Sequence, residues 1–204
     1  MTSEASNWII DPREFFRDKV STALSNQNLK VCEEIEFYLV NLLCGFIAPE
    51  KLKTALGELD LIDTPLAIIF KHALEAPPEK QLKLYKVMGD TSLYMSGYFQ
   101  DYFNRKTYDM SYYITLGAQA YNHLAGLVKH QKQGPFRDVY THLSENFPAL
   151  VDVVAEVADQ SGMSGDSNLL ALYDRWSKSQ SERLRKKLVD KGIDPVPSNT
   201  RDAQ

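Results

Sequence analysis

The chain has 204 residues, of which 44% are hydrophobic and 25% are charged, a balance typical of an ordinary globular domain. The formal net charge of −4 gives no overall basic character and argues against nucleic-acid binding. The most apolar segment, residues 35–47, contains Glu36 and Asn41 and is too short to span a membrane. Residues 1–7 lack the basic flank and apolar run of a signal peptide, so we expect a cytoplasmic protein.

Helix start signals recur along the chain, whereas strand signals are almost absent. Asp11-Pro12 followed by Glu14 combines an N-cap, a proline at the first helical position and a capping-box glutamate. This pattern predicts a helix that runs to about residue 26. A second helix is predicted over residues 29–46, with apolar residues on two adjacent faces. Such a helix belongs at the centre of a bundle.

The middle of the chain predicts three more helices. Thr64-Pro65 starts a short helix that continues through Glu75. A long helix follows over residues 78–105, with a possible break or kink at Gly89-Asp90. Residues 109–131 form the next helix, whose apolar residues again make two stripes. A helix with two apolar faces is covered on both sides, so this helix should also be central.

The last third of the chain predicts helices that open at Gly134-Pro135 and at residues 146–148, and an amphipathic helix over residues 166–190. Residues 193–204 are expected to be a disordered tail. Taken together, the sequence predicts an all-α fold in a single domain, residues 1–204. This domain would be a bundle of about seven or eight helices with central helices near residues 29–46 and 109–131.

Tyrosine is concentrated in the middle of the chain. Of the eleven tyrosines, those between residues 85 and 121 are Tyr85, Tyr94, Tyr98, Tyr102, Tyr108, Tyr112, Tyr113 and Tyr121. A tyrosine ring favours burial while its hydroxyl requires a hydrogen-bond partner, so this segment should be apolar and hydrogen-bonded at once. The tyrosine-rich segment is therefore the part of the sequence that we interpret as specialised for a function.

Small residues accompany these rings on both predicted helices. They are Gly89, Ser92, Ser96 and Gly97 on the first helix, and Gly117, Ala118, Ala120, Ala125 and Gly126 on the second. Small side chains among large rings can leave an apolar tunnel with a few polar groups, as in many ligand sites. They can equally let two helices approach closely and leave no cavity. Both interpretations follow from the sequence.

Asp90 is the acidic residue that stands out, because it follows Gly89 inside a mostly apolar helical stretch. A buried carboxylate is costly unless it is paired. The favoured interpretation is an N-cap whose carboxylate accepts a hydrogen bond from the amide of Ser92 or Leu93. The alternative is a polar anchor that bonds a tyrosine hydroxyl or a ligand.

Sequence patterns of known catalytic and metal centres are missing. The Glu-x-x-His pairs of ferritin-like helices do not occur, and His123 and His130 are too far apart along one helix to share a metal. There is no phosphate-binding glycine loop and no nucleophile elbow. We therefore expect no enzyme, no metal and no cofactor.

Several short blocks carry a family resemblance. They are residues 38–43, Met88 to Leu93 running into Ser96-Gly97-Tyr98-Phe99, residues 112–121 and Leu172 to Trp176. Together they resemble a family of small, all-helical bacterial cytoplasmic proteins with no established activity, over roughly residues 30–195. The resemblance implies that the tyrosine-rich segment belongs to the fold or site shared by such proteins.

Two functional hypotheses follow. The first is a non-catalytic soluble protein that binds a lipophilic small molecule, such as a fatty acid, in a tyrosine-rich pocket between helices, with Arg105, Lys106 or His123 at its mouth. The predicted ligand-binding residues are Tyr94, Tyr98, Tyr112, Tyr113, Tyr121, His123 and Arg105. The second is a homodimeric interaction module or scaffold without a small ligand, because tyrosine, methionine and phenylalanine are enriched at interface centres.

A third, weaker hypothesis concerns the basic residues near the C-terminus. Arg183, Arg185 and Lys187 lie on the last predicted helix above Leu184 and Leu188. An amphipathic basic helix can contact a membrane surface or a nucleic acid. The favoured interpretation is a solvated helix face, so we expect no nucleic-acid partner and no integral membrane association.

Overall fold

The computed structural model describes residues 11–47, 65–98, 100, 110–130 and 134–161, together with parts of residues 172–195. Its helices are α1 (Pro12–Asn26), α2 (Glu33–Ile47), α4 (Leu66–Glu75), α5 (Pro78–Tyr98), α7 (Met110–His130), α8 (Gly134–Glu145), α9 (Phe147–Gln160) and α11 (Glu182–Asp190). These are eight helices, and no strand occurs among the residues described. The predicted all-α bundle of about seven or eight helices is confirmed.

The helices begin where the local signals predicted. The carboxylate of Asp11 accepts a hydrogen bond from the amide of Arg13 at 3.0 Å, and Pro12 occupies the first position of α1. Pro65 precedes α4 and Pro78 is the first residue of α5. Proline suits these places because its fixed φ is helical and its missing N–H has no partner to lose.

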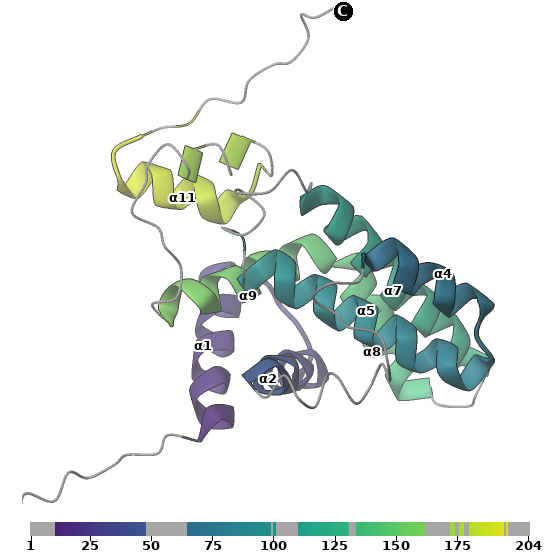
Figure 1. Cartoon of the computed structure of the whole chain (residues 1–204). Helices are drawn as coiled ribbons and strands as arrows, with labels where there is room; N and C mark the ends of the chain where they lie inside the picture. The colour runs from purple at the N-terminus through teal and green to yellow at the C-terminus, as the bar shows by residue number, and fades with distance from the viewer. Residues whose placement is uncertain are drawn as a thin grey trace, which may run out of the picture.

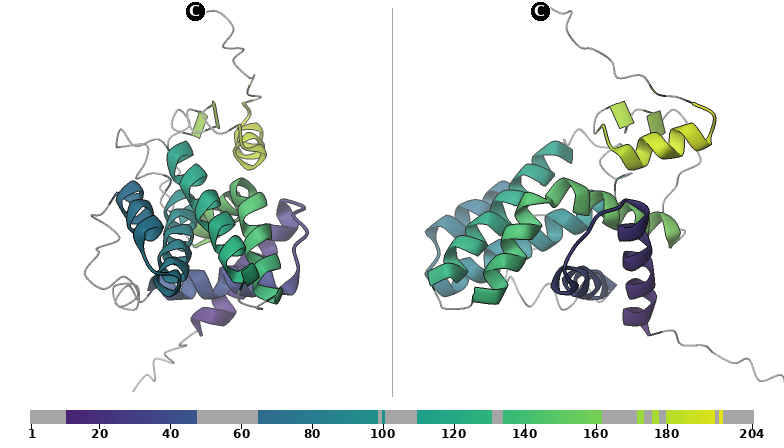
Figure 2. Two further views of the ribbon diagram at one scale, coloured as in Figure 1. Left: turned by 90° about the vertical axis from the view of Figure 1, so that its right-hand side faces the viewer. Right: turned by 180° about the vertical axis from the view of Figure 1, so that it is seen from behind.

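Helices α5, α7, α8 and α9 form the main bundle, and α4 lies against α5 and α7 (Figure 1). Helices α1 and α2 lie next to each other at one end of this bundle, where α2 contacts α5 and α8 and α1 contacts α9 (Figure 2). Helix α5 touches four other helices, as does α7. The molecule is thus centred on the pair α5–α7, with α2 closing the core from the end.

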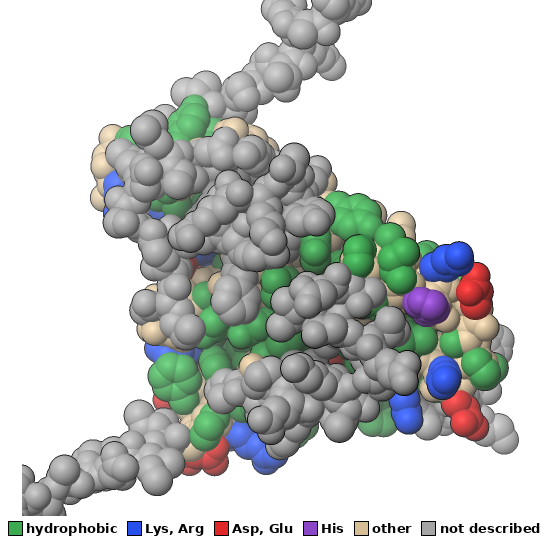
Figure 3. Space-filling model, in the orientation of Figure 1, with side chains coloured by type: hydrophobic (Ala, Val, Ile, Leu, Met, Phe, Trp, Pro, Cys, Tyr) green, Lys and Arg blue, Asp and Glu red, His purple; other side chains and the backbone are tan. Residues whose placement is uncertain are grey.

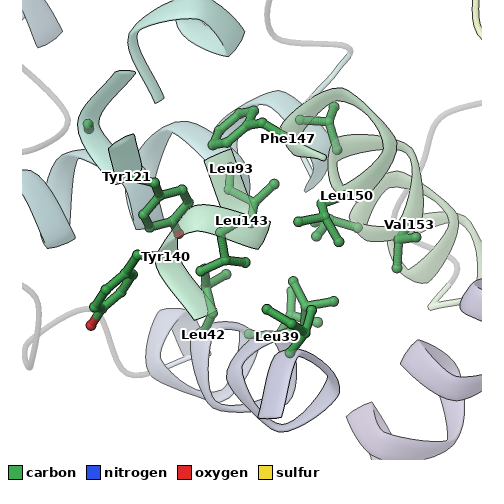
Figure 4. Close-up of a cluster of buried hydrophobic side chains, with 14 of the residues drawn as sticks. Leu39, Leu42, Leu93, Tyr121, Tyr140, Leu143, Phe147, Leu150 and Val153 are labelled. Carbon is green, nitrogen blue, oxygen red and sulfur yellow. The ribbon is translucent and has the colours of Figure 1, made fainter. Parts of the chain in front are cut away.

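Both helices that the sequence predicted to be central contribute to the core, but α2 does so from one end of the bundle and only α7 is central. Leu39 and Leu42 of α2 face Leu143, Leu150 and Val153 of α8 and α9 (Figure 4). Helix α7 is covered by α5 on one side and α8 on the other, and its exposed positions form a polar stripe that includes Ser111, Thr115, Gln119 and Asn122. Helix α7 is thus covered on two sides as predicted, although Tyr112 and His123 of the second apolar stripe are exposed.

Glycine allows the central helices to approach closely. A methyl group on Gly97 would lie 2.5 Å from Cβ of Val154 on α9. On Gly117 it would overlap the ring of Phe147 and lie 2.7 Å from Cβ of Ser92 on α5. The hydroxyl of Ser92 donates a hydrogen bond to the carbonyl of Tyr113 across the same interface. At these positions the small residues bring helices together, which was one of the two interpretations left open by the sequence.

Gly117→Ala is expected to lower the free energy of unfolding by about 1–3 kcal/mol, because the added methyl group overpacks a filled interface. Gly126 provides a matched control on the same helix, since a methyl group there meets nothing within 4 Å. Gly126→Ala should raise stability by about 0.5–1 kcal/mol through helix propensity. Urea unfolding of both variants checks the prediction. Equal changes in the two proteins would show that the α5–α7 interface has room to spare.

Two predictions about helix continuity are wrong. Helix α5 runs through Gly89 and Asp90 without a break. The predicted helix over residues 166–190 is interrupted, because Gln180 has a φ of 52° and Ser181 is extended. This interruption lets Leu172 and Trp176 pack with Leu184 and Leu188 in a second cluster, to which Ile193 also packs.

Two residues of the predicted tail over residues 193–204 are described by the structure. The amide of Ile193 donates to the carbonyl of Leu188 at 2.8 Å, and Pro195 is buried. The rest of that tail lies outside the described residues, and the extent of the domain stays a prediction. Within the described part, no helix has the length and apolar character needed to cross a membrane.

Candidate functional site

A buried polar cluster lies in the tyrosine-rich segment, centred on Asp90 in the middle of α5. Oδ1 of Asp90 accepts hydrogen bonds from the hydroxyl of Tyr38 on α2, at 2.5 Å, and from the hydroxyl of Tyr121 on α7, at 2.8 Å. Oδ2 accepts from Nζ of Lys86 at 2.5 Å. The carboxylate therefore ties α2, α5 and α7 together, and we call these four residues the Asp90 cluster.

The favoured interpretation of Asp90 as an N-cap is wrong. The residue lies inside a continuous helix, where the amides that a cap would satisfy already have helical partners. The alternative, an anchor for a tyrosine hydroxyl, is correct and involves two tyrosines. Gly89 contributes to the arrangement, because a methyl group there would lie 2.6 Å from the ring of Tyr121.

Burial keeps the phenols of this cluster protonated. Desolvation raises the pKa of Tyr38 and of Tyr121 well above 10, and the nearby charge of Asp90 raises both further. Burial and then Asp90 raise the pKa of Tyr140, on α8, to about 12. Tyr140 adds ring contacts at 6.0 Å to Tyr38 and 6.2 Å to Tyr121. At neutral pH these hydroxyls are donors, and a neutral phenol is a poor general base.

The Asp90 cluster suits a structural role. Both carboxylate oxygens are engaged by donors of the chain itself, and Lys86 also lies 5.2 Å from the ring centroid of Tyr38 in a cation–π contact. A buried carboxylate with three donors is satisfied and needs no ligand. We therefore assign this cluster to holding the helices together.

The described members of the predicted ligand-binding set take part in different contacts. Tyr121 belongs to the Asp90 cluster. Tyr94 stacks between Phe46 and Tyr98, with ring centroids 3.8 Å and 5.1 Å away, and burial raises its pKa to about 12. His123 is exposed and stacks on Tyr85 at 5.1 Å.

The remaining predicted residues lie elsewhere. Tyr112 is 41% exposed, and its ring meets that of Tyr113 edge-on. They lie at the first turn of α7, in the region where Figure 3 shows apolar side chains on the surface. Arg105 and Lys106 lie outside the described residues. The described rings of this set make several separate ring contacts, and a ligand site among them stays a prediction.

An open groove of about 630 Å³ lies between the first halves of α1 and α2. It is lined by Asp11, Arg13, Glu14, Arg17, Glu33, Glu34, Glu36, Phe37, Val40 and Asn41. Phe37 is 60% exposed and is the most exposed of the large hydrophobic residues of the described part. Figure 3 shows acidic and basic side chains together in the region of these two helices. We refer to this feature as the α1–α2 groove.

The groove walls carry different charges. Glu33, Glu34 and Glu36 stand on α2, whereas Arg13 and Arg17 stand on α1 among Asp11 and Glu14. Within the described part of the chain, no ion pair joins these arginines to these carboxylates. The groove therefore presents charged groups that are not neutralised by one another.

Sequence reasoning missed the groove because its walls come from two different helices. The available signal was Phe37, an aromatic residue directly after Glu33, Glu34 and Glu36 on the first turns of a helix. Acidic residues are also favoured there by the helix dipole, which gives them a local reason to be present. Phe37 has no such reason to be exposed.

The basic C-terminal cluster is partly used inside the molecule. Arg183 donates to Asp159 at 2.5 Å and to Gln100 at 3.1 Å, and Lys187 pairs with the same Asp159. Burial raises the pKa of Asp152, which accepts a hydrogen bond from Ser181, although Arg183 lies 3.6 Å away and lowers it. These contacts attach α11 to α9 and engage Arg183 and Lys187 within the molecule.

Comparisons with known proteins add no identity. No protein-family model, no curated protein and no solved structure matches the chain, so the family resemblance stays a prediction. Among the described residues, no group of three or more histidine, cysteine, aspartate or glutamate side chains is placed to hold a metal ion.

Proposed function

We propose that this protein is a non-catalytic, cytoplasmic interaction module that binds a segment of another protein in the α1–α2 groove. The observation that carries the proposal is the 60% exposure of Phe37 in an open groove of about 630 Å³. An exposed aromatic side chain inside a concavity offers apolar area that a partner can cover. The proposal differs from the homodimeric module suggested by the sequence, because the partner is another protein and the groove lies outside the tyrosine-rich segment.

The shape and lining of the groove support a protein partner over a small molecule. Ligand pockets that enclose a small molecule are mostly apolar with a few polar groups. This groove is open, and seven of its ten lining residues are charged. An aromatic centre with a polar, charged rim is instead the usual anatomy of a protein interface.

The position of Phe37 on α2 makes it available as an anchor. Glu33 precedes it by one helical turn and Val40 follows it by one turn, so the three share one face. The opposite face of α2 is buried in the core through Ile35, Leu39 and Leu43. A rigid helix therefore presents Phe37, which reduces the entropy lost when a partner binds.

Selection of a random peptide library against the immobilised protein tests this proposal. We expect enriched peptides whose affinity falls roughly tenfold or more with Phe37→Ala, as for an interface anchor. Phe136→Ala is the matched control, because Phe136 is also a 58% exposed phenylalanine but lies on α8. Both variants should keep the wild-type thermal stability. Enriched peptides that bind the Phe37→Ala variant as well as wild type would refute the proposal.

A second candidate is binding of a fatty acid or similar lipophilic molecule along the stacked rings of Phe46, Tyr94 and Tyr98. The hydroxyl of Thr91, on the same face of α5 as Tyr94 and Tyr98, is buried and has no hydrogen-bond partner among the described residues. A ligand with a polar end would supply one. Organic extraction of the purified protein followed by mass spectrometry tests this candidate, and an extract without lipid argues against it.

The alternative of a homodimer is compatible with the same surface. Sedimentation analysis distinguishes it, because a dimer formed through the groove dissociates with Phe37→Ala and persists with Phe136→Ala.

A further inference from the structure

We infer that the partner segment of the α1–α2 groove is basic and carries an apolar residue that covers Phe37. This inference rests on the proposed function and names the chemistry of the partner. The groove has five carboxylates, from Asp11, Glu14, Glu33, Glu34 and Glu36, against two guanidinium groups, from Arg13 and Arg17. Its formal charge is therefore 2 − 5 = −3, so it favours a positively charged occupant.

Charge and apolar area are arranged together on the α2 wall. Glu33 lies one helical turn before Phe37, and Glu36 lies one turn before Val40. A lysine or arginine of a partner can pair with these carboxylates while its neighbour covers the phenyl ring. A cationic group over the face of Phe37 would add a cation–π contact. The two kinds of contact thus fall within one short segment.

The α1 wall limits the partner further. Arg13 and Arg17 are one turn apart on the same face of α1. The carboxylate of Asp11 already accepts a hydrogen bond from the amide of Arg13 as the helix cap, so Asp11 is less available to pair with a partner. A uniformly positive segment would meet repulsion from both arginines. The favoured occupant therefore places its basic residues along α2, as an amphipathic helix lying in the groove does.

Phe37 distinguishes this surface from an ordinary acidic helix start. Acidic residues in the first turn of α2 are explained by the helix dipole alone. The exposed ring and the open concavity beside it have no such local explanation. Their coincidence with the net negative charge argues for a partner with both positive charge and an apolar anchor.

Fluorescence anisotropy with two synthetic peptides tests the inference. The basic probe is a labelled peptide of about twelve residues, three helical turns, built from lysine, leucine and one tryptophan with the lysines on one face. The second probe replaces every lysine by glutamate. We expect the basic peptide to bind, with an affinity that falls as salt increases, and the acidic peptide to bind at least roughly tenfold more weakly.

Variants locate the contact. The double variant Glu33→Gln with Glu36→Gln should lower the affinity for the basic peptide and make that affinity depend less on salt. Phe37→Ala should lower the affinity roughly tenfold or more. The control pair Glu75→Gln with Glu79→Gln changes two exposed glutamates on α4 and α5 and should have no effect. All of these side chains except Glu36 are exposed, so the variants should fold, which circular dichroism verifies.

The outcomes separate this inference from the proposed function. Two results would overturn the inference that the partner is basic: equal binding of both peptides, or binding of the basic peptide that is unchanged by Glu33→Gln with Glu36→Gln. If Phe37→Ala still weakens binding in either case, the groove remains the binding surface and the proposed function stands. Enrichment of acidic or neutral library peptides whose binding requires Phe37 would likewise overturn the basic partner and leave the groove as the binding surface. If neither probe nor any library peptide depends on Phe37, both the inference and the proposed function fail.

Discussion

Asp90→Ala is expected to lower the free energy of unfolding by about 2–5 kcal/mol, because two buried phenol hydroxyls lose their acceptor at about 1–3 kcal/mol each. The substitution leaves the hydroxyls of Tyr38 and Tyr121 without their acceptor, and both rings are held by neighbouring rings. Lys86 loses its ion pair as well. Because these donors come from α2, α5 and α7, the loss should affect the whole bundle. Urea unfolding measures it.

Controls identify the source of the destabilisation. Asp138→Ala, at an exposed position of α8, should change stability by no more than about 0.5 kcal/mol. Tyr121→Phe removes one donor and should cost about 1–2 kcal/mol. In the double variant Asp90→Ala with Tyr121→Phe the costs should be less than additive. Additive costs would mean that the hydrogen bond between these two residues contributes little to stability.

Alkaline pH is expected to destabilise the protein by roughly 2–3 kcal/mol for each pH unit above about 10. The buried Tyr38 and Tyr121 have pKa values well above 10 in the folded protein, whereas an unfolded chain has ordinary tyrosines. Below about pH 10 both states keep these protons and stability is unchanged. Above it the unfolded state releases protons that the native state retains, so stability falls.

The effect ends only when pH exceeds the folded pKa values. Tyr94 and Tyr140, with pKa values of about 12, add to the slope only up to about pH 12, where the native state releases their protons as well. Urea unfolding over a pH series, with phenolate absorbance recorded in parallel, measures the effect. Tyr38→Phe should reduce the pH slope by about 1.4 kcal/mol per unit. A slope near zero above pH 10 in the wild type would contradict the burial of these hydroxyls.

Local signals in the sequence predicted the helices well. The start of α1 at Asp11-Pro12 is predictable because the signal lies in neighbouring residues. The same holds for the prolines before α4 and at the start of α5, so no tertiary information is needed to predict these starts. The two apolar faces of α7 are likewise a property of one helix. The break at Gly89 was predicted because glycine disfavours a helix, but the close approach of Tyr121 makes glycine necessary there.

Interactions between distant residues were not predictable. The partners of Asp90 include Tyr38, 52 residues earlier, and Tyr121, 31 residues later, and nothing local selects them among eleven tyrosines. The interruption of the last helix at Gln180 allows Trp176 and Leu184, on either side of it, to pack in one cluster. The α1–α2 groove depends on how two helices are placed relative to each other. The sequence therefore contained only one indication of it, an aromatic residue, Phe37, directly after the acidic start of α2.

A fluorine label at position 37 gives the most direct test of the α1–α2 groove as the binding surface. 4-Fluorophenylalanine is placed at position 37 in one sample and at position 136 in another, and fluorine NMR spectra are recorded while the basic peptide is added. Binding in the groove predicts a resonance at position 37 that shifts to saturation, with the affinity found by anisotropy, and an unchanged resonance at position 136. A bound peptide that leaves position 37 unchanged would contradict the assignment of the groove.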